Sequence, residues 1–186
     1  ARLNGNYLDV AGLGDSGFML LRPNAPEADG QRTFSIVGRS REQQHAFNYP
    51  FQLARIPAKL QEMLGDSAVQ DTAEHCARYE FPTMVGDLVL LFSDGFSDNL
   101  FEAEILDVLS SLATSKAEVT PEEAVSPAII AKELCSKAYL QSCNPLVWTP
   151  FSVSAAKVGE TRCGGKLDDI TVVAAWVVAD EEDLFD

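Results

Sequence analysis

The sequence has little basic charge, few histidines and no cysteine arrangement typical of a zinc site. Its 186 residues contain 14 Lys and Arg against 28 Asp and Glu, which gives a net charge of −14. Such a field repels a phosphodiester backbone, so we expect no nucleic-acid partner. The four cysteines form no C-x-x-C pair, and neither His45 nor His75 lies at zinc-ligand spacing from them. We therefore expect no zinc centre.

Long apolar runs are also absent. No stretch of about 18 uncharged apolar residues occurs, so we predict no membrane span. The composition, 46% hydrophobic, is typical of a chain that buries a sizeable core without disulfides, which favours free thiols in a reducing compartment. We predict one globular domain over residues 1–179, followed by an acidic tail over residues 180–186.

What is present is a set of apolar segments bounded by turn-forming residues. We predict strands over residues 7–13, 17–22, 32–40, 86–94 and 168–178. The segment 86–94 is apolar on both alternating sets of positions, which indicates a strand covered on both faces. Strands at both ends of the chain, with helices inserted together between them, predict an α+β fold, a layered sheet core with helices outside.

Helix start signals occur after the fourth strand. Asn99, followed by Glu102, has the spacing of an N-cap with its capping-box partner, which predicts a helix over about residues 100–114. Thr120 and Pro121 predict a second helix start, and Pro127 divides it into two pieces. The remaining long connections, 41–57 and 144–165, are predicted to be loops, and the two tryptophans, Trp148 and Trp176, are predicted to lie in the core.

Carboxylates follow one pattern at three strand ends. Asp15 in GLGDSG, Asp94 in LFSDGF and the pair Asp168 and Asp169 in GGKLDDIT each lie beside glycine at the edge of an apolar segment. Converging strand ends would form an all-oxygen pocket for a hard cation. Each Asp taken alone is also explained as a turn former, and Asp98 as a residue that favours the positive end of a helix. We predict that Asp94 and Asp168 converge, with Asp15 close behind.

Two further expectations concern the last of these segments. Side chains of adjacent residues in extended backbone point to opposite faces, so only one of Asp168 and Asp169 readily joins Asp94, and spacing does not say which. Gly164 and Gly165 are predicted to form the turn that delivers Asp168. An EF-hand starting at Asp94 is excluded, because position 6 of that loop needs Gly and holds Asn99.

Three ordered motifs carry a family resemblance. GLGDSGFMLLR, GDLVLLFSDGFSDNL and GGKLDDITVVAAWVV resemble the metal-dependent protein serine/threonine phosphatases of type 2C, the PPM family. The segment REQQHAFNYPFQLA is similar to the branch found in mitochondria and plastids. The resemblance covers about residues 6–178. It implies a β-sandwich of two antiparallel sheets flanked by helices, Mn²⁺ or Mg²⁺ at one edge, and a phosphoserine or phosphothreonine protein as substrate. It further implies a mitochondrial or plastid location, with the cytoplasm as the alternative, and we expect a monomer.

The resemblance also implies roles for single residues. Asp94 and Asp168 match ligands of a dinuclear metal centre, and are the expected catalytic pair. Asp15 matches an Asp that helps to hold a third, weaker ion, Asp98 a supporting Asp near that ion, and Asp169 a residue behind the ligands. Two such dications lower the pKa of a bridging water and orient the phosphate for in-line displacement, without a covalent phosphoenzyme.

The chain departs from the family at its N-terminal side. The resemblance implies an acidic strand motif, a phosphate-binding Arg and a D-G-x-G-G run, and none occurs in these residues. Asp29-Gly30 lies after the GDSG motif and in a predicted turn, so we reject it as a substitute. The chain therefore resembles the C-terminal two-thirds of a catalytic domain. It is a fragment, is completed by a separate piece, or is a catalytically incomplete domain that regulates or binds proteins.

The loop after the third strand contains two candidate recognition pairs. His45 and Phe47 would lie near the substrate entrance in this branch of the family, or would simply pack within the loop. Arg39 and Arg41 could attract a phosphopeptide, or could be solvated.

Overall fold

The computed structural model describes residues 1–28, 30–65, 70–113 and 125–179. Its strands are β1 (Arg2–Asn4), β2 (Tyr7–Gly12), β3 (Gly17–Pro23), β4 (Phe34–Arg39), β5 (Gln44–Ala46), β6 (Tyr49–Pro50), β7 (Ala77–Pro82), β8 (Leu88–Phe92) and β9 (Val172–Trp176). Its helices are α1 (Ala58–Leu64), the 3₁₀ turn η2 (Ala73–His75), α2 (Asp94–Ser97), α3 (Glu102–Leu112), α4 (Pro127–Ser142) and α5 (Pro150–Lys157). The predicted tail 180–186 and the predicted helix start at Thr120 lie outside the described residues.

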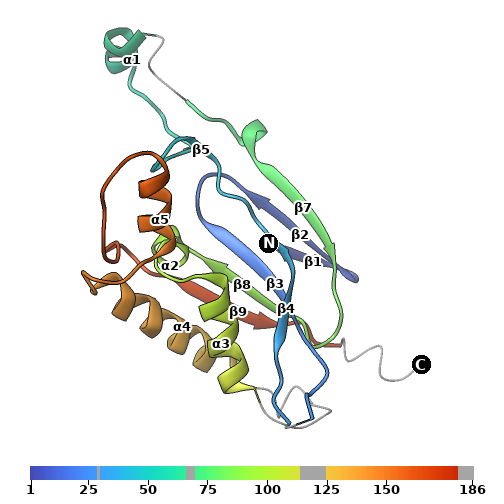
Figure 1. Cartoon of the computed structure of the whole chain (residues 1–186). Helices are drawn as coiled ribbons and strands as arrows, with labels where there is room; N and C mark the ends of the chain where they lie inside the picture. Colours follow the sequence, from blue (N-terminus) through green and yellow to red (C-terminus); the bar gives the residue numbers. More distant parts are fainter. Residues whose placement is uncertain (29, 66–69, 114–124, 180–186) are drawn as a thin grey trace.

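The strands form two main antiparallel sheets that face one another (Figure 1). One sheet has the order β4-β3-β8-β9 and the other the order β1-β2-β7, while β5 and β6 form a separate hairpin. Helices α3 and α4 cover the outer face of the four-stranded sheet. The predicted α+β fold, a sandwich of antiparallel sheets flanked by helices, is confirmed.

Both faces of β8 are covered, as its unbroken apolar sequence predicts. Leu88, Leu90 and Phe92 point into the main core, where they pack with residues of α3 and α4. Val89 and Leu91 point the other way and pack in the smaller core between the two sheets, which contains Phe18 and Leu20 and residues of β2 and β7. Burial of these alternating sets fixes the register of β8, because a slip of one residue would exchange its faces.

The helix predicted from an Asn99 cap begins later than expected. The chain first makes the short helix α2, and α3 begins only at Glu102. The N-terminal turn of α3 is stabilised by the side chain of Glu104, whose Oε2 accepts a hydrogen bond from the backbone N–H of Phe101 at 2.9 Å. The capping prediction was wrong because Asn99 is buried and uses its side chain elsewhere.

The predicted loop 144–165 contains a helix. Thr149 caps α5: its Oγ1 accepts from the backbone N–H of Ser152 at 3.3 Å, and Ser152 Oγ accepts from the backbone N–H of Thr149 at 2.8 Å. Pro150 occupies the first helical position, where its missing N–H costs nothing. Trp148, just before the cap, is 61% exposed, so its predicted place in the core was wrong. Trp176 is half-buried beside the main core, as predicted.

No helix in the described ranges is long and apolar enough to cross a membrane.

Candidate metal centre

Strand ends bring three carboxylates together. Asp94 lies two residues after β8 as the first residue of α2, Asp98 follows α2, and Asp168 lies four residues before β9. Strands β8 and β9 are antiparallel neighbours with Phe92 opposite Val172, so the two flanking segments lie side by side. One carboxylate oxygen of each Asp lies within 4.8 Å of the others. We call these three residues the acidic cluster; the predicted convergence of Asp94 and Asp168 is what the structure shows.

Glycine at position 95 permits this approach. A Cβ on Gly95 would lie 2.6 Å from the carbonyl oxygen of Asp169 and 3.1 Å from the Cβ of Asp168. Ser93 stabilises the approach of these two segments. Its Oγ donates to the carbonyl of Asp169 at 2.8 Å and accepts from the backbone N–H of Thr171 at 3.0 Å. Asp169 thus contributes backbone, and of the adjacent pair it is Asp168 whose carboxylate joins the acidic cluster.

Asn99 connects the segment after β8 to the segment before β9 by hydrogen bonds. Its side-chain amide donates to the carbonyl of Gly95 and to the carbonyl of Lys166, each at 2.8 Å, and its Oδ1 accepts from the backbone N–H of Lys166 at 2.9 Å. The residue is fully buried. Gly164 and Gly165, predicted to form the turn that delivers Asp168, lead into this contact, and of the two only Gly164 has a positive φ, of 94°.

Lys166 lies at the centre of the acidic cluster, and the sequence analysis missed it. Its Nζ is 3.0 Å from Asp94, 2.6 Å from Asp98 and 3.1 Å from Asp168. The side chain is 16% exposed. The only sequence signal was its position, two residues before Asp168 in the GGKLDD segment.

Two further carboxylates lie near the acidic cluster. Asp15, on the turn between β2 and β3, lines the same cleft as Asp94 and Asp98. Burial, and then the negative charge of Asp94, raise the pKa of Asp15. Glu42, which no sequence feature indicated, also lines the cleft, and burial followed by the charge of Asp98 raises its pKa. The predicted neighbourhood of Asp15 and the acidic cluster is therefore present.

The positive charge of Lys166 acts against the effect of burial on the pKa values of Asp98 and Asp168. Burial raises the pKa of Asp98, although the hydrogen bond from Lys166 acts against this. Burial would also raise the pKa of Asp168, but the N–H of Asp169 and the Lys166 ammonium together lower it. For Lys166, hydrogen bonds to Asp98 and Asp94 outweigh burial and raise its pKa, so the side chain is a fixed positive charge at neutral pH.

The acidic cluster fits a hard divalent ion in chemistry and in spacing. Its donors are carboxylate oxygens, which Mg²⁺ and Mn²⁺ prefer, and they are close enough to share one ion at metal–oxygen distances of about 2.0 to 2.6 Å. The three carboxylates already hold one cation, the ammonium of Lys166. The described residues thus offer a ligand set for one ion, with Asp15 available beside it.

The loop after β4 forms one wall of the cleft. Phe47 lies 5.3 Å, ring to ring, from Phe151, and both line the cleft. His45 is held away from it, because its Nε2 lies 2.9 Å from the Oδ2 of Asp71 and its ring stacks on Phe51 at 4.0 Å. Phe47 thus fits the predicted substrate entrance, whereas His45 packs within the loop.

The two arginines of this region also differ. Arg39 forms an ion pair with Glu102. The backbone N–H of Arg41 donates to the hydroxyl of Tyr79 at 3.0 Å, and its side chain is exposed, beside a second cleft that also includes Asp15.

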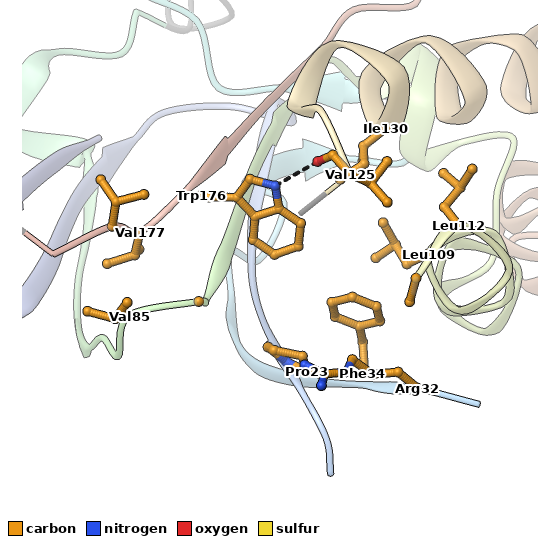
Figure 2. Close-up of a pocket in the computed structure, with 13 residues that line it drawn as sticks. Pro23, Arg32, Phe34, Val85, Leu109, Leu112, Val125, Ile130, Trp176 and Val177 are labelled. Carbon is orange, nitrogen blue, oxygen red and sulfur yellow. Dashed lines mark hydrogen bonds between the residues drawn. The ribbon is translucent and has the colours of Figure 1, made fainter. Parts of the chain in front are cut away.

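A different, apolar pocket lies at the opposite end of the four-stranded sheet (Figure 2). Phe34, Leu109, Ile130 and Trp176 line it, and the indole N–H of Trp176 donates to the carbonyl of Val125 at 2.9 Å. The described residues that line it include no Asp or Glu, so we place the chemistry at the acidic cluster.

Comparison with known proteins identifies relatives. The chain is 33% identical over 170 residues to "Protein phosphatase PTC7 homolog" of Danio rerio, a match that covers 91% of this chain and 50% of that protein. It is 30% identical over 178 residues to "Probable protein phosphatase 2C 71" of Oryza sativa subsp. japonica, which covers 95% of this chain and 32% of that protein. This chain is a homologue of the type 2C protein phosphatases.

A solved structure agrees with this type 2C assignment. The photosystem II phosphatase PBCP matches with a TM-score of 0.66 and 26% sequence identity, over 92% of this chain and 59% of that one. A scan against protein-family models finds no match. The chain spans about half the length of the Danio rerio relative and about a third of the length of the Oryza sativa relative.

Proposed function

We propose that this chain supplies the metal-binding part of a protein serine/threonine phosphatase that hydrolyses phosphomonoesters with a metal-activated water. The observation that supports this most is the convergence of Asp94, Asp98 and Asp168 from two strand ends. The relatives named as protein phosphatases support the reaction class.

In this proposal Asp94 and Asp168 are the principal ligands of Mn²⁺ or Mg²⁺. Asp98 supports them, and Asp15 serves a further ion, so that the whole enzyme holds two or three. A divalent ion there would supply charge that lowers the pKa of a coordinated water and neutralises phosphate oxygens. The chain itself fixes the carboxylates through Asn99 and Gly95, while Phe47 and Phe151 narrow the cleft and limit access of bulk water.

The substrate, location and assembly follow as further parts of the proposal. We propose a phosphoserine or phosphothreonine protein as substrate, a mitochondrial or plastid location, and a monomer. The photosystem II name of the structural neighbour supports an organellar role.

One observation favours the alternative, a catalytically incomplete regulatory domain. Lys166 already neutralises part of the acidic cluster without any metal ion. A domain of this kind would bind proteins but would neither hold Mn²⁺ nor hydrolyse a phosphomonoester.

The test is hydrolysis of a phosphothreonine peptide with Mn²⁺ and with EDTA. We compare the chain alone with a chimaera that adds the N-terminal segment of the zebrafish relative. We expect the chimaera to be far faster, because it supplies the remaining ligands and a phosphate-binding Arg, and EDTA to abolish its activity. Activity that survives EDTA would contradict the metal mechanism, and an inactive chimaera that binds no Mn²⁺ would support the regulatory alternative.

Substitutions in the chimaera test the ligand roles. Asp94→Asn should lower kcat/KM at least about a hundredfold, as expected when charge stabilisation of a transferring phosphoryl group is lost, and Asp98→Asn should lower it less. Asp107→Asn, at an exposed position of α3, is the matched control and should leave kcat/KM unchanged. Full activity of the Asp94→Asn protein would remove Asp94 from the proposed ligand set.

A further inference from the structure

Lys166 has a position that the proposed phosphatase chemistry does not explain. Its ammonium lies within hydrogen-bond distance of all three carboxylates of the acidic cluster. We propose that Lys166 is an internal counter-cation, which neutralises the acidic cluster in the metal-free protein and must leave it when a divalent ion binds. This inference rests on the proposed metal site and adds a competition within it.

The competition follows from the shared oxygens. The ammonium uses oxygens of Asp94, Asp98 and Asp168 at 2.6 to 3.1 Å. A divalent ion needs oxygens of the same carboxylates at about 2.0 to 2.6 Å. The Oδ1 atoms of Asp94 and Asp168 already accept hydrogen bonds from backbone N–H groups at 2.8 and 2.9 Å, so the ion and the ammonium compete for the Oδ2 atoms. Two positive charges at that separation repel strongly in a partly buried site, so the ion and the ammonium cannot both occupy it.

The side chain can leave while its backbone stays. Both backbone polar groups of Lys166 are bonded to the buried side chain of Asn99, at 2.8 and 2.9 Å. The four-carbon stem is flexible, so displacement needs only rotation about its own bonds. Phe151 offers a place for the displaced ammonium, since its ring centroid already lies 5.0 Å from Nζ. Glu42, in the same cleft, provides a nearby negative charge.

Calorimetric titration with Mn²⁺ tests the competition on this chain without any activity assay. Lys166→Met keeps the length of the stem and removes the charge, and Lys157→Met at an exposed position of α5 is the matched control. We expect Lys166→Met to bind Mn²⁺ at least about tenfold more tightly than the wild type and the control. Equal or weaker binding by the Lys166→Met protein would overturn the inference and leave the metal site intact, whereas no Mn²⁺ binding by any of the three would overturn both.

A second measurement uses the unaltered protein, in case the substitution disturbs folding. Amine acetylation, followed by mass spectrometry of each lysine, compares the protein in EDTA with the protein in Mg²⁺ at one pH. We expect Lys166 to react several-fold faster in Mg²⁺, because it no longer bonds to three carboxylates, and Lys157 to react equally in both. An equal or slower reaction of Lys166 in Mg²⁺ would show that the ammonium stays in place and would overturn the inference.

Discussion

At the scale of single residues, the acidic cluster and Asp87 show two contrasting environments for a carboxylate. The carboxylates of the acidic cluster face one another around Lys166, whereas Asp87 has a structural ion pair. Its side chain is 1% exposed, and its oxygens accept from Nε and Nη2 of Arg22 and from the backbone N–H of Met84, each at 2.8 Å. Both oxygens are satisfied, so this carboxylate anchors β3 to the turn before β8.

We expect Asp87→Ala to lower the free energy of unfolding by about 2–4 kcal/mol. The substitution leaves the guanidinium of Arg22 and the N–H of Met84 without this partner, and breaking a largely buried pair costs most of that amount. Urea denaturation measures it, with Asp107→Ala at an exposed position as the control. A loss below about 0.5 kcal/mol, the range of ordinary surface substitutions, would contradict this account of Asp87.

Residues of the site were predictable from the sequence to different degrees. Asp15 and Asp94 could be found because each lies beside glycine at the end of an apolar strand, and Asp168 because it lies between a Gly-Gly pair and the last apolar strand. Lys166 and Glu42 could not, since a single charged residue in a polar segment is most often solvated. Only the tertiary structure, which places them against carboxylates from other strands, distinguishes them.

At the scale of elements, the segment before β9 is positioned by close backbone packing against α4. A Cβ on Gly165 would lie 2.1 Å from the carbonyl oxygen of Gln141 and 2.5 Å from the Cα of Ser142. A Cβ on Gly164 would lie 2.7 Å from the Cα of Pro145. The end of α4 is therefore the surface on which Lys166 and Asp168 are placed.

We expect Gly165→Ala to cost about 1–3 kcal/mol or more of stability, and to weaken Mn²⁺ binding, because the backbone must shift to admit the methyl group. Thermal unfolding and calorimetric titration measure the two effects. Gly12→Ala is the matched control, since a Cβ at Gly12 meets nothing within 4 Å and its φ is not positive. If both variants behave alike, packing against α4 does not position the segment.

The strands were predicted better than the helices. The strand predictions 7–13, 17–22, 32–40 and 86–94 correspond to β2, β3, β4 and β8, because burial on defined faces gives clear patterns. Helix α5 was missed although Thr149 and Pro150 are a cap and a first-turn proline, since the segment before them is rich in loop-forming residues. Strand β7 was missed as well, although the alternation of charged and aromatic residues over 78–81 was an available signal.

At the scale of the whole molecule, negative charge dominates, with a net charge of −14. Asp15, Glu42 and Asp98 have raised pKa values in the folded protein, chiefly because of burial. A group with a raised folded pKa binds its proton more readily in the folded than in the unfolded state. Its contribution to stability is therefore present at low pH and is lost as pH rises through the folded pKa.

We expect the metal-free protein to become more stable as the pH falls from neutral through the raised folded pKa values of these three carboxyls. Asp168, whose pKa is lowered, acts in the opposite sense, but only as the pH falls through its own lower folded value. Urea midpoints in EDTA at several pH values measure the trend. Glu42→Gln should reduce the rise of the urea midpoint with falling pH. A midpoint that falls steadily from pH 7 to 5 would contradict the expected gain in stability.

Asn99 has a consequence for how this site can vary among descendants of one ancestor. Its side-chain amide forms hydrogen bonds with the backbone of Lys166 and not with the lysine side chain. A further hydrogen bond connects the amide to the turn that carries Asp94. The backbone hydrogen bonds that set the spacing of the carboxylates therefore do not depend on which side chain residue 166 has. Mutation can replace the charge of that side chain while these backbone hydrogen bonds are inherited unchanged.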